Sequence, residues 1–129
     1  MKLKMVGLGK MGLNLALNMK EHGVDVEGFD VNEEARKKAE SENIKTYASL
    51  EDAVSKDEKN VIWVMLPAGK ITNSVLNQLV ELCKANDIVI DGGNSDHRDS
   101  LKTAHLMEEK GIYFFDIGTS GGVYGARHG

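Results

Sequence analysis

Short apolar runs alternate with segments of helical period along the whole chain. The apolar runs predict six strands, at 3–6, 24–29, 44–47, 61–66, 87–90 and 112–116. Between them the pattern predicts helices that begin near Gly12, Asn32, Ser49, Lys70 and Asp96. The run at 61–66, VIWVML, has no polar position, as expected of a parallel strand covered on both faces. This alternation predicts an α/β fold with a doubly wound parallel sheet in the order 3-2-1-4-5-6.

Two of the predicted helices indicate which of their sides faces the sheet. In the first helix, a stripe of helical period is expected to pack on the sheet: Gly12, Leu15, Ala16 and Met19. Leu13 and Leu17 form a second stripe, which predicts an exposed apolar surface. In the helix at 70–85, one apolar side is expected at Ile71, Val75, Leu79 and Leu82.

Three glycines follow the first predicted strand at GxGxxG spacing. Gly7 permits a tight turn, Gly9 removes a side chain where the backbone would approach a pyrophosphate, and Gly12 lets the next helix lie close to the sheet. The helix then offers N–H groups to the phosphates. Because the chain has 14 glycines, an ordinary βαβ unit is the alternative. The strand and helix that flank the glycines favour dinucleotide binding. Residues 1–129 are therefore predicted to form one Rossmann-like dinucleotide-binding domain.

Asp30 ends the second predicted strand, where a ribose-binding acid is expected. Its carboxylate can accept hydrogen bonds from ribose hydroxyl groups, but it would repel the 2′-phosphate of NADP by about 4 kcal/mol, for charges about 4 Å apart at an effective dielectric of about 20. Val31 supplies no cation, so NAD is the predicted cofactor. The basic residues at 36–38 are expected to form mostly a solvated face, because a full helical turn separates them from the strand end; a phosphate-binding role is the alternative.

Composition limits the other classes of function. A net charge of -4 without a basic stripe argues against nucleic acid as the main partner, and the sequence has no run long enough to span a membrane. The single Cys83 fits a reducing cytosol and is expected to be a small packed residue, because no His or Cys lies at metal-ligand spacing from it. A cytoplasmic protein without a metal site is therefore expected.

In a doubly wound sheet, ligands bind at the carboxyl ends of the strands where the strand order reverses. Turns rich in glycine are expected at that edge, including 92–95 and 118–122. Asn94 can hold a carboxamide or a substrate hydroxyl group, although a turn-forming Asn is the alternative. The N–H groups of 120–122 can form a nest for a carboxylate, although a flexible tail explains this sequence equally well.

With these turns in place, the chain resembles the cofactor domain of the 6-phosphogluconate dehydrogenase family. The similar stretches are GLGKMGLNLALNM, DGGNSDHRDS and FFDIGTSGGVYGARHG, which together span nearly the whole chain. Most members have Asn-Arg-Ser/Thr after the second strand, where the Arg binds the NADP phosphate; here the triplet is Asp30, Val31 and Asn32, which resembles the branch that uses NAD.

The resemblance implies the roles of individual residues. Cofactor contacts are implied for Gly7, Leu8, Gly9, Lys10, Met11, Gly12, Asp30, Val31, Asn32, Leu66, Pro67, Ala68 and Asn94. Substrate contacts are implied for Asn94, Ser120, Gly121 and Gly122. No catalytic residue is assigned, because the general base Lys and general acid Glu of the family lie beyond the position of Gly129.

The implied reaction belongs to the pentose phosphate pathway and to gluconate utilization. It is hydride transfer from 6-phosphogluconate to the nicotinamide, followed by loss of CO₂ to give ribulose 5-phosphate. The 129 residues are expected to be the N-terminal part of such an enzyme, inactive alone, whose homodimeric parent adds a helical domain. Two alternatives stay open: a 3-hydroxyisobutyrate-type dehydrogenase, which usually has Asp-x-Ser-Thr where this chain has residues 91–94, and a non-catalytic NAD-binding module.

Overall fold

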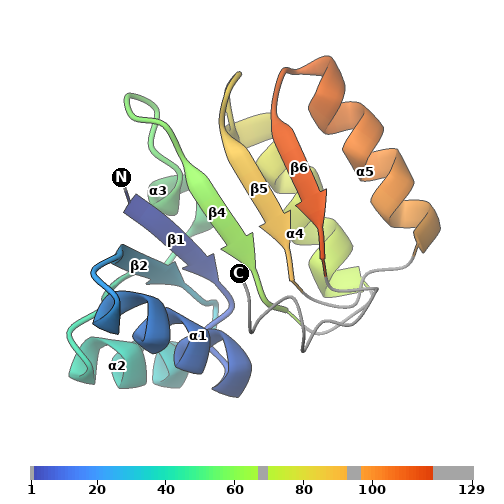
Figure 1. Cartoon of the computed structure of the whole chain (residues 1–129). Helices are drawn as coiled ribbons and strands as arrows, with labels where there is room; N and C mark the ends of the chain where they lie inside the picture. Colours follow the sequence, from blue (N-terminus) through green and yellow to red (C-terminus); the bar gives the residue numbers. More distant parts are fainter. Residues whose placement is uncertain (1, 67–69, 93–96, 118–129) are drawn as a thin grey trace.

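A computed structural model describes residues 2–66, 70–92 and 97–117 of the chain. Six strands form one parallel sheet: β1 (Lys2–Val6), β2 (Asp25–Phe29), β3 (Lys45–Tyr47), β4 (Val61–Val64), β5 (Ile88–Asp91) and β6 (Tyr113–Asp116). Five helices connect them: α1 (Lys10–Glu21), α2 (Glu33–Ser41), α3 (Leu50–Ala53), α4 (Lys70–Leu82) and α5 (His97–Glu109). The strand order is β3-β2-β1-β4-β5-β6, which confirms the predicted doubly wound, Rossmann-like sheet (Figure 1).

The helices cover both faces of the sheet. One core cluster joins the sheet to α3, α4 and α5 through residues such as Val64, Leu79 and Met107. The second cluster joins the opposite face to α1 and α2 through residues such as Met5 and Ala16. Fully buried strands such as β4 are uniformly apolar because side chains on both faces meet a helical layer. Among the described residues, no helix is both long and apolar enough to cross a membrane.

Helix α1 ends just before a glycine and buries a wider face than the sequence predicts. Gly23 follows the helix at φ +88°, and the Val24 N–H donates to the Met19 carbonyl at 3.0 Å, so β2 begins at Asp25 and not at Val24. The predicted exposed stripe is wrong for Leu13, which is only 5% exposed, and Leu17 is half-buried against the same cluster. A helix that packs between a sheet and a second helix buries more than one row of side chains.

Helix α4 packs most of the predicted row against the core, since Leu79 is buried and Val75 and Leu82 are partly buried there, but a neighbouring row is buried more deeply. Its buried residues are Thr72, Leu76, Leu79 and Val80, followed by Cys83 just after the helix. Ile71, which was expected on the packed side, is 59% exposed. Two rows of apolar residues share Leu79, and periodicity alone does not choose between them. The prediction that Cys83 is packed is confirmed, and burial raises the pKa of its thiol to about 12.

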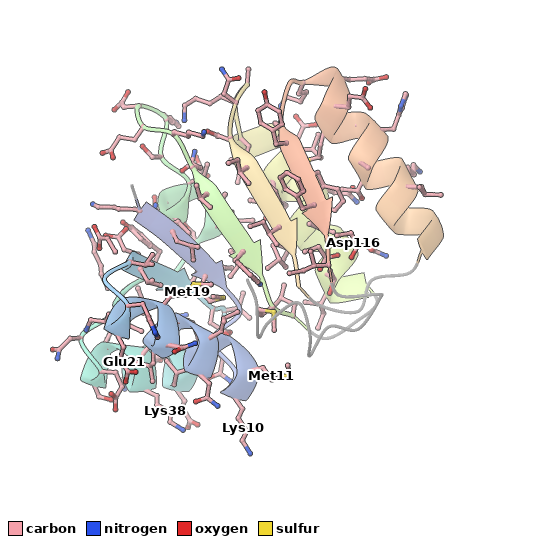
Figure 2. All side chains as sticks on the ribbon, in the orientation of Figure 1. Lys10, Met11, Met19, Glu21, Lys38 and Asp116 are labelled. Atoms are coloured by element: carbon pink, nitrogen blue, oxygen red, sulfur yellow. The ribbon has the colours of Figure 1, made fainter. Side chains whose placement is uncertain are left out.

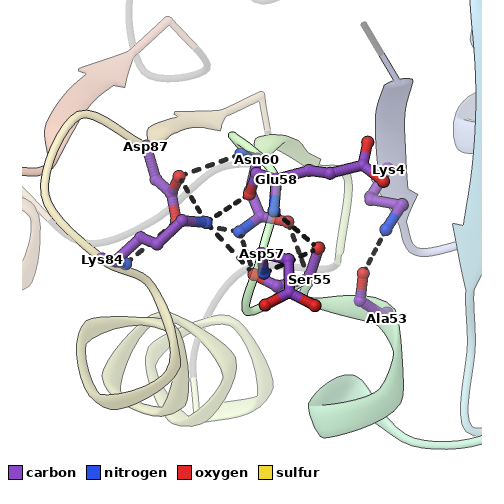
Figure 3. A network of polar contacts seen from close by, with 8 residues as sticks. All are labelled: Lys4, Ala53, Ser55, Asp57, Glu58, Asn60, Lys84 and Asp87. Atoms are coloured by element: carbon purple, nitrogen blue, oxygen red, sulfur yellow. Dashed lines mark hydrogen bonds and ion pairs between the residues drawn. The ribbon is translucent and has the colours of Figure 1, made fainter.

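A network of polar contacts holds the amino ends of β4 and β5 together (Figure 3). The buried Asp87 carboxylate accepts hydrogen bonds from the Asn60 backbone N–H, the Asn60 side chain and the Lys84 N–H, each at 2.9 Å. Burial alone would raise the pKa of Asp87, but these hydrogen bonds outweigh it and hold the pKa below its usual range. This network therefore fixes the edge of the sheet opposite to the carboxyl ends of the strands.

The α1 and α2 layer does not extend over the last strands. On this face, Ile88 pairs with Tyr113 and Ile90 with Phe115 along β5 and β6. Tyr113 is 56% exposed and Phe115 is 49% exposed. Figure 1 shows β5 and β6 beside α1 and α2 but outside the area that these helices cover. We call this surface the β5–β6 face.

Candidate cofactor-binding site

The carboxyl ends of the central strands lie level with one another at one edge of the sheet. Val6 at the end of β1 pairs with Phe29 of β2 on one side and with Val64 of β4 on the other. The sheet order reverses at this point, since β1 leads through α1 to β2, whereas β4 lies on the other side of β1. The predicted glycine turn follows β1 directly and therefore sits at the switch point.

Two glycines of this turn are required by close contacts. Gly7 has φ +102°, and a Cβ atom there would lie 2.3 Å from the Met65 carbonyl oxygen. A Cβ atom on Gly12 would lie 1.9 Å from the Gly7 carbonyl oxygen. Both contacts are with backbone atoms, which cannot rotate away as a side chain can. The first turn of α1 therefore packs against the end of β1 at a distance that only glycine permits, as the motif predicts.

Gly9 differs from these two because a side chain there would contact no other described part of the chain. A Cβ atom on Gly9 would meet nothing within 4 Å. Gly9 is the N-cap of α1, and among the described residues no side chain caps this helix and its first turn contains no acidic residue. By contrast, α2 is capped by the Asn32 side chain and has two glutamates in its first turn. The start of α1 thus combines open space, N–H groups and a positive dipole end, which suits an anion.

Asp30 connects the glycine turn to the start of α2. Its Oδ2 accepts a hydrogen bond from the Leu8 N–H at 2.8 Å, and its Oδ1 accepts one from the Asn32 N–H at 2.9 Å. The Asn32 side chain in turn accepts from Glu34 N–H at 2.8 Å and from Ala35 N–H at 3.2 Å. These hydrogen bonds hold the Asp30 carboxylate in place beside Gly9 without a ligand. Its remaining lone pairs can accept hydrogen bonds from further donors.

A groove of about 470 Å³ opens between the glycine turn and α2. Its lining residues are Leu8, Gly9, Lys10, Leu13, Asn14, Asn32, Glu34, Ala35 and Lys38. Figure 2 shows Lys10 of α1 and Lys38 of α2 extending outward at the same end of the molecule. The groove therefore has an apolar floor and two exposed cations at its mouth, together with one carboxylate from Glu34.

The basic segment at 36–38 is mostly a solvated face, as predicted, but Arg36 is partly buried. The Arg36 guanidinium Nη1 donates to the Asp30 carbonyl oxygen at 2.7 Å in a partly buried contact. Lys37 instead pairs with Glu33 at 3.3 Å, and both of these side chains are exposed. Side chains on a helix point toward its N-terminus, so Arg36 in the fourth position of α2 reaches back over the helical turn. That direction was the signal available in the sequence.

The remaining predicted site residues are only partly described. The Leu8 side chain is buried in the core and faces the site through its backbone, whereas Met11 is 59% exposed and Val31 is 82% exposed. Leu66 is half-buried just beyond the end of β4. The other predicted residues lie outside the described part of the chain: Pro67, Ala68, Asn94, Ser120, Gly121 and Gly122.

Comparison with known protein families shows to which family the chain belongs. The family profile described as the NAD binding domain of 6-phosphogluconate dehydrogenase matches residues 2–129. The chain belongs to this family. The chain is thus an NAD-binding domain of the dehydrogenase class that includes 6-phosphogluconate and 3-hydroxyisobutyrate dehydrogenases.

Individual relatives and similar solved structures extend this result. The NAD(+)-dependent, decarboxylating 6-phosphogluconate dehydrogenase of Bacillus subtilis is 37% identical over 96% of the chain and 28% of its own length. The 3-hydroxyisobutyrate dehydrogenase of Mycobacterium tuberculosis has a TM-score of 0.83 and 27% identity, over 96% of this chain and 42% of that one. Plasmodium falciparum 6-phosphogluconate dehydrogenase, solved with NADP+ among other states, has a TM-score of 0.77 and 27% identity over 98% and 29%. The chain therefore spans less than half the length of these relatives.

Proposed function

We propose that the chain is the cofactor-binding domain of an NAD-dependent, decarboxylating 6-phosphogluconate dehydrogenase. The observation that carries this proposal is the open space over Gly9, bordered by the uncapped start of α1 and the fixed Asp30 carboxylate. The residues there fit a dinucleotide, since they offer N–H groups for a pyrophosphate and carboxylate oxygens for a ribose. On family grounds, the parent protein would be a cytoplasmic homodimer of the pentose phosphate pathway.

The proposal assigns the parts of the cofactor to parts of the site. Gly9, Lys10 and Met11 would bind the pyrophosphate through the backbone, and Asp30, Val31 and Asn32 would contact the adenosine ribose. Leu66, Pro67 and Ala68 would lie along the adenosine side. When bound, the nicotinamide supplies the hydride acceptor for oxidation of the sugar acid. Asn94 would contact both nicotinamide and substrate, and the substrate carboxylate would meet the N–H groups of 120–122.

The choice of NAD rests on the charge of Asp30. A 2′-phosphate on a ribose bound to this carboxylate would face a like charge, whereas free hydroxyl groups would donate hydrogen bonds to it. Relatives named in the comparisons include an NAD(+)-dependent enzyme and one solved with NADP+, so the family alone does not decide the cofactor. Asp30 is the residue in this chain that supports NAD.

Calorimetric titration of the chain with NAD at fixed salt tests the proposal. Saturable binding with one nucleotide per chain is expected, and Gly9→Ala should weaken it because the added methyl group would separate the backbone from the pyrophosphate. Absence of binding to the unsubstituted, folded chain would refute the cofactor role. Far-UV circular dichroism of the same sample would establish that the chain is folded.

A second candidate is a 3-hydroxyisobutyrate-type dehydrogenase. The observation that favours it is the higher TM-score of the Mycobacterium tuberculosis enzyme, 0.83 against 0.77 for the Plasmodium falciparum enzyme. The two candidates would share the cofactor site and differ in substrate. A protein in which this domain is joined to a second domain of the family should reduce NAD with 6-phosphogluconate under the first proposal and with 3-hydroxyisobutyrate under the second. Reduction with only the latter would overturn the first proposal.

A further inference from the structure

A polar pocket of about 200 Å³ lies beside the network that joins the amino ends of β4 and β5, and we call it the amino-edge pocket. Side chains of β1, β2 and β3 line it, together with others from the segment 52–60. Asn60 belongs both to the pocket and to the network. Helix α3 has four residues, so it covers this part of the sheet less than a longer helix would. None of the residues that line the groove beside the glycine turn lines this pocket.

Two buried charges form the floor of the amino-edge pocket. Lys4 of β1 and Glu27 of β2 are partners in the sheet, and both are buried. The Glu27 carboxylate accepts a hydrogen bond from the Tyr47 hydroxyl at 2.7 Å and lies 3.7 Å from the Lys4 ammonium. The Lys4 ammonium donates to the Ala53 carbonyl oxygen (Figure 3), so both charges are held in place.

The Lys4 ammonium keeps hydrogen-bonding capacity for a ligand. An ammonium has three N–H donors, and among the described residues only the Ala53 carbonyl oxygen lies within hydrogen-bond distance of Lys4. Burial lowers the pKa of Lys4 below its ordinary value although the Glu27 carboxylate raises it, so Glu27 compensates the buried charge only in part. A further anionic group in the pocket would complete that compensation.

Charges of both signs surround the mouth of the pocket. Asp52, Glu58 and Lys59 line it and are exposed. Within the part of the chain that the structure describes, the charged groups of these three residues take part in no ion pair. Figure 3 shows the Glu58 side chain extending from its loop toward Lys4. The charges at the mouth can therefore bind a ligand without first giving up a protein partner.

We propose that the amino-edge pocket binds a small α-amino acid in its zwitterionic form. The carboxylate of the ligand accepts hydrogen bonds from Lys4 and Lys59, and its ammonium group pairs with Asp52 and Glu58. The size of the pocket suits this class, because a water molecule takes about 30 Å³ and the pocket thus has space for about six or seven non-hydrogen atoms, as in alanine or serine. This inference does not depend on the proposed cofactor function.

Ligands that carry one sign of charge fit the lining less well. A simple anion such as phosphate would face three carboxylates of the lining, and a simple cation would face three ammonium groups. Among the described residues, no group of three or more His, Cys, Asp or Glu side chains could hold a metal ion. A zwitterion offers both kinds of lining group a partner of opposite charge.

Calorimetric titration of the chain with glycine, L-alanine and L-serine tests the inference. Saturable binding of L-alanine, with one molecule per chain, is expected. L-Alaninamide lacks the carboxylate and propionate lacks the ammonium group, so each should bind at least about tenfold more weakly than L-alanine.

A double variant tests the residues at the mouth. Asp52→Asn with Glu58→Gln removes both partners of the ammonium group and should weaken L-alanine binding by about fivefold to tenfold. Glu51→Gln with Asp57→Asn is the matched control, because it removes two exposed carboxylates that do not line the pocket, and it should change the affinity by less than about twofold. Both double variants should bind NAD as the unsubstituted chain does, so the outcome is independent of the cofactor function.

Amide NMR locates the bound amino acid and separates the remaining outcomes. L-Alanine should shift the N–H signals of Lys4, Ser55 and Lys59, whereas shifts confined to the glycine turn would place it in the cofactor site and overturn the inference. Binding of propionate or of L-alaninamide as tightly as L-alanine would also overturn it, since a site for a single charge would then be sufficient. An equal loss of affinity in the matched control, or absence of binding by all three amino acids, would be equally decisive against it.

Discussion

Two separate alanine substitutions in the glycine turn should affect different properties. Gly12→Ala should lower stability, whereas Gly9→Ala should weaken cofactor binding. At Gly12 the new Cβ would lie 1.9 Å from the Gly7 carbonyl oxygen. Because this oxygen belongs to the backbone, the contact is relieved only if α1 moves away from β1, and the rotation of one side chain is not enough. Overpacking of this kind lowers the free energy of unfolding by up to about 3 kcal/mol. Alanine offsets about 0.5–1 kcal/mol of this loss, because it favours the helix more than glycine does and loses less conformational entropy on folding. The free energy of unfolding should therefore fall by about 2 kcal/mol in Gly12→Ala.

At Gly9 the balance is different. The new methyl group meets no atom of the described residues within 4 Å, and the φ of -68° is one that alanine adopts. Loss of N-cap preference, a few tenths of a kcal/mol or more, is offset by a gain of about 0.4–1 kcal/mol from the stiffer unfolded chain. The free energy of unfolding should stay within about 0.5 kcal/mol of its original value, whereas NAD affinity should fall at least about tenfold, since backbone and pyrophosphate can no longer touch.

Urea denaturation, followed by the fluorescence of the buried Trp63, measures the free energy of unfolding. Calorimetric titration with NAD measures the affinity. The unsubstituted chain is the common reference for both variants. The reasoning would be refuted if Gly9→Ala were as unstable as Gly12→Ala, or if it bound NAD with unchanged affinity. Tolerance of Gly12→Ala within about 0.5 kcal/mol would refute the packing argument at α1.

Three other predictions follow from named contacts. Asp30→Asn should shift the ratio of NADP to NAD affinity toward NADP by about tenfold, because it removes the like charge; an unchanged ratio in paired titrations would contradict this. Because hydrogen bonds hold the folded pKa of Asp87 below its unfolded value, its stabilisation is present above about pH 4 and is lost as the pH falls through the folded pKa. Asp87→Asn should therefore show a smaller acid decline in unfolding free energy than the original chain, and equal declines would exclude this carboxylate as a cause. The buried Cys83, with its pKa raised to about 12, should react with a disulfide reagent at pH 8 only as fast as the chain unfolds, and immediate labelling of the native chain would show that the thiol is accessible.

The architecture follows from local signals that act in the same direction. The strand order and the glycine turn were predictable because apolar runs, glycine positions and Asp30 each restrict the backbone strongly. A positive φ at Gly7 and backbone contacts at Gly12 leave few alternatives for the residues between β1 and α1. Short-range sequence patterns are sufficient where the geometry is this constrained.

The errors arose where packing between elements decides. Leu13 is buried because a second helix lies beside α1, and the pattern within α1 does not contain that information. In α4, Leu76 of the neighbouring row is fully buried whereas Ile71 of the predicted row is exposed, although both rows have helical period. Arg36 is the partly buried member of the basic segment, because its long side chain reaches back toward β2. Tertiary contacts of side chains set all three outcomes.

The β5–β6 face makes concentration a variable in every experiment on this chain. Tyr113 and Phe115 are exposed on the terminal strand of the sheet, so an apolar surface lies next to a strand edge. Such an edge lowers its free energy when another apolar surface displaces its water, including that of a second molecule. Self-association of folded chains through this face would stabilise the folded state by mass action and alter ligand binding, both more strongly at higher protein concentration. Affinities and unfolding energies therefore describe the isolated domain only where they stay constant on dilution.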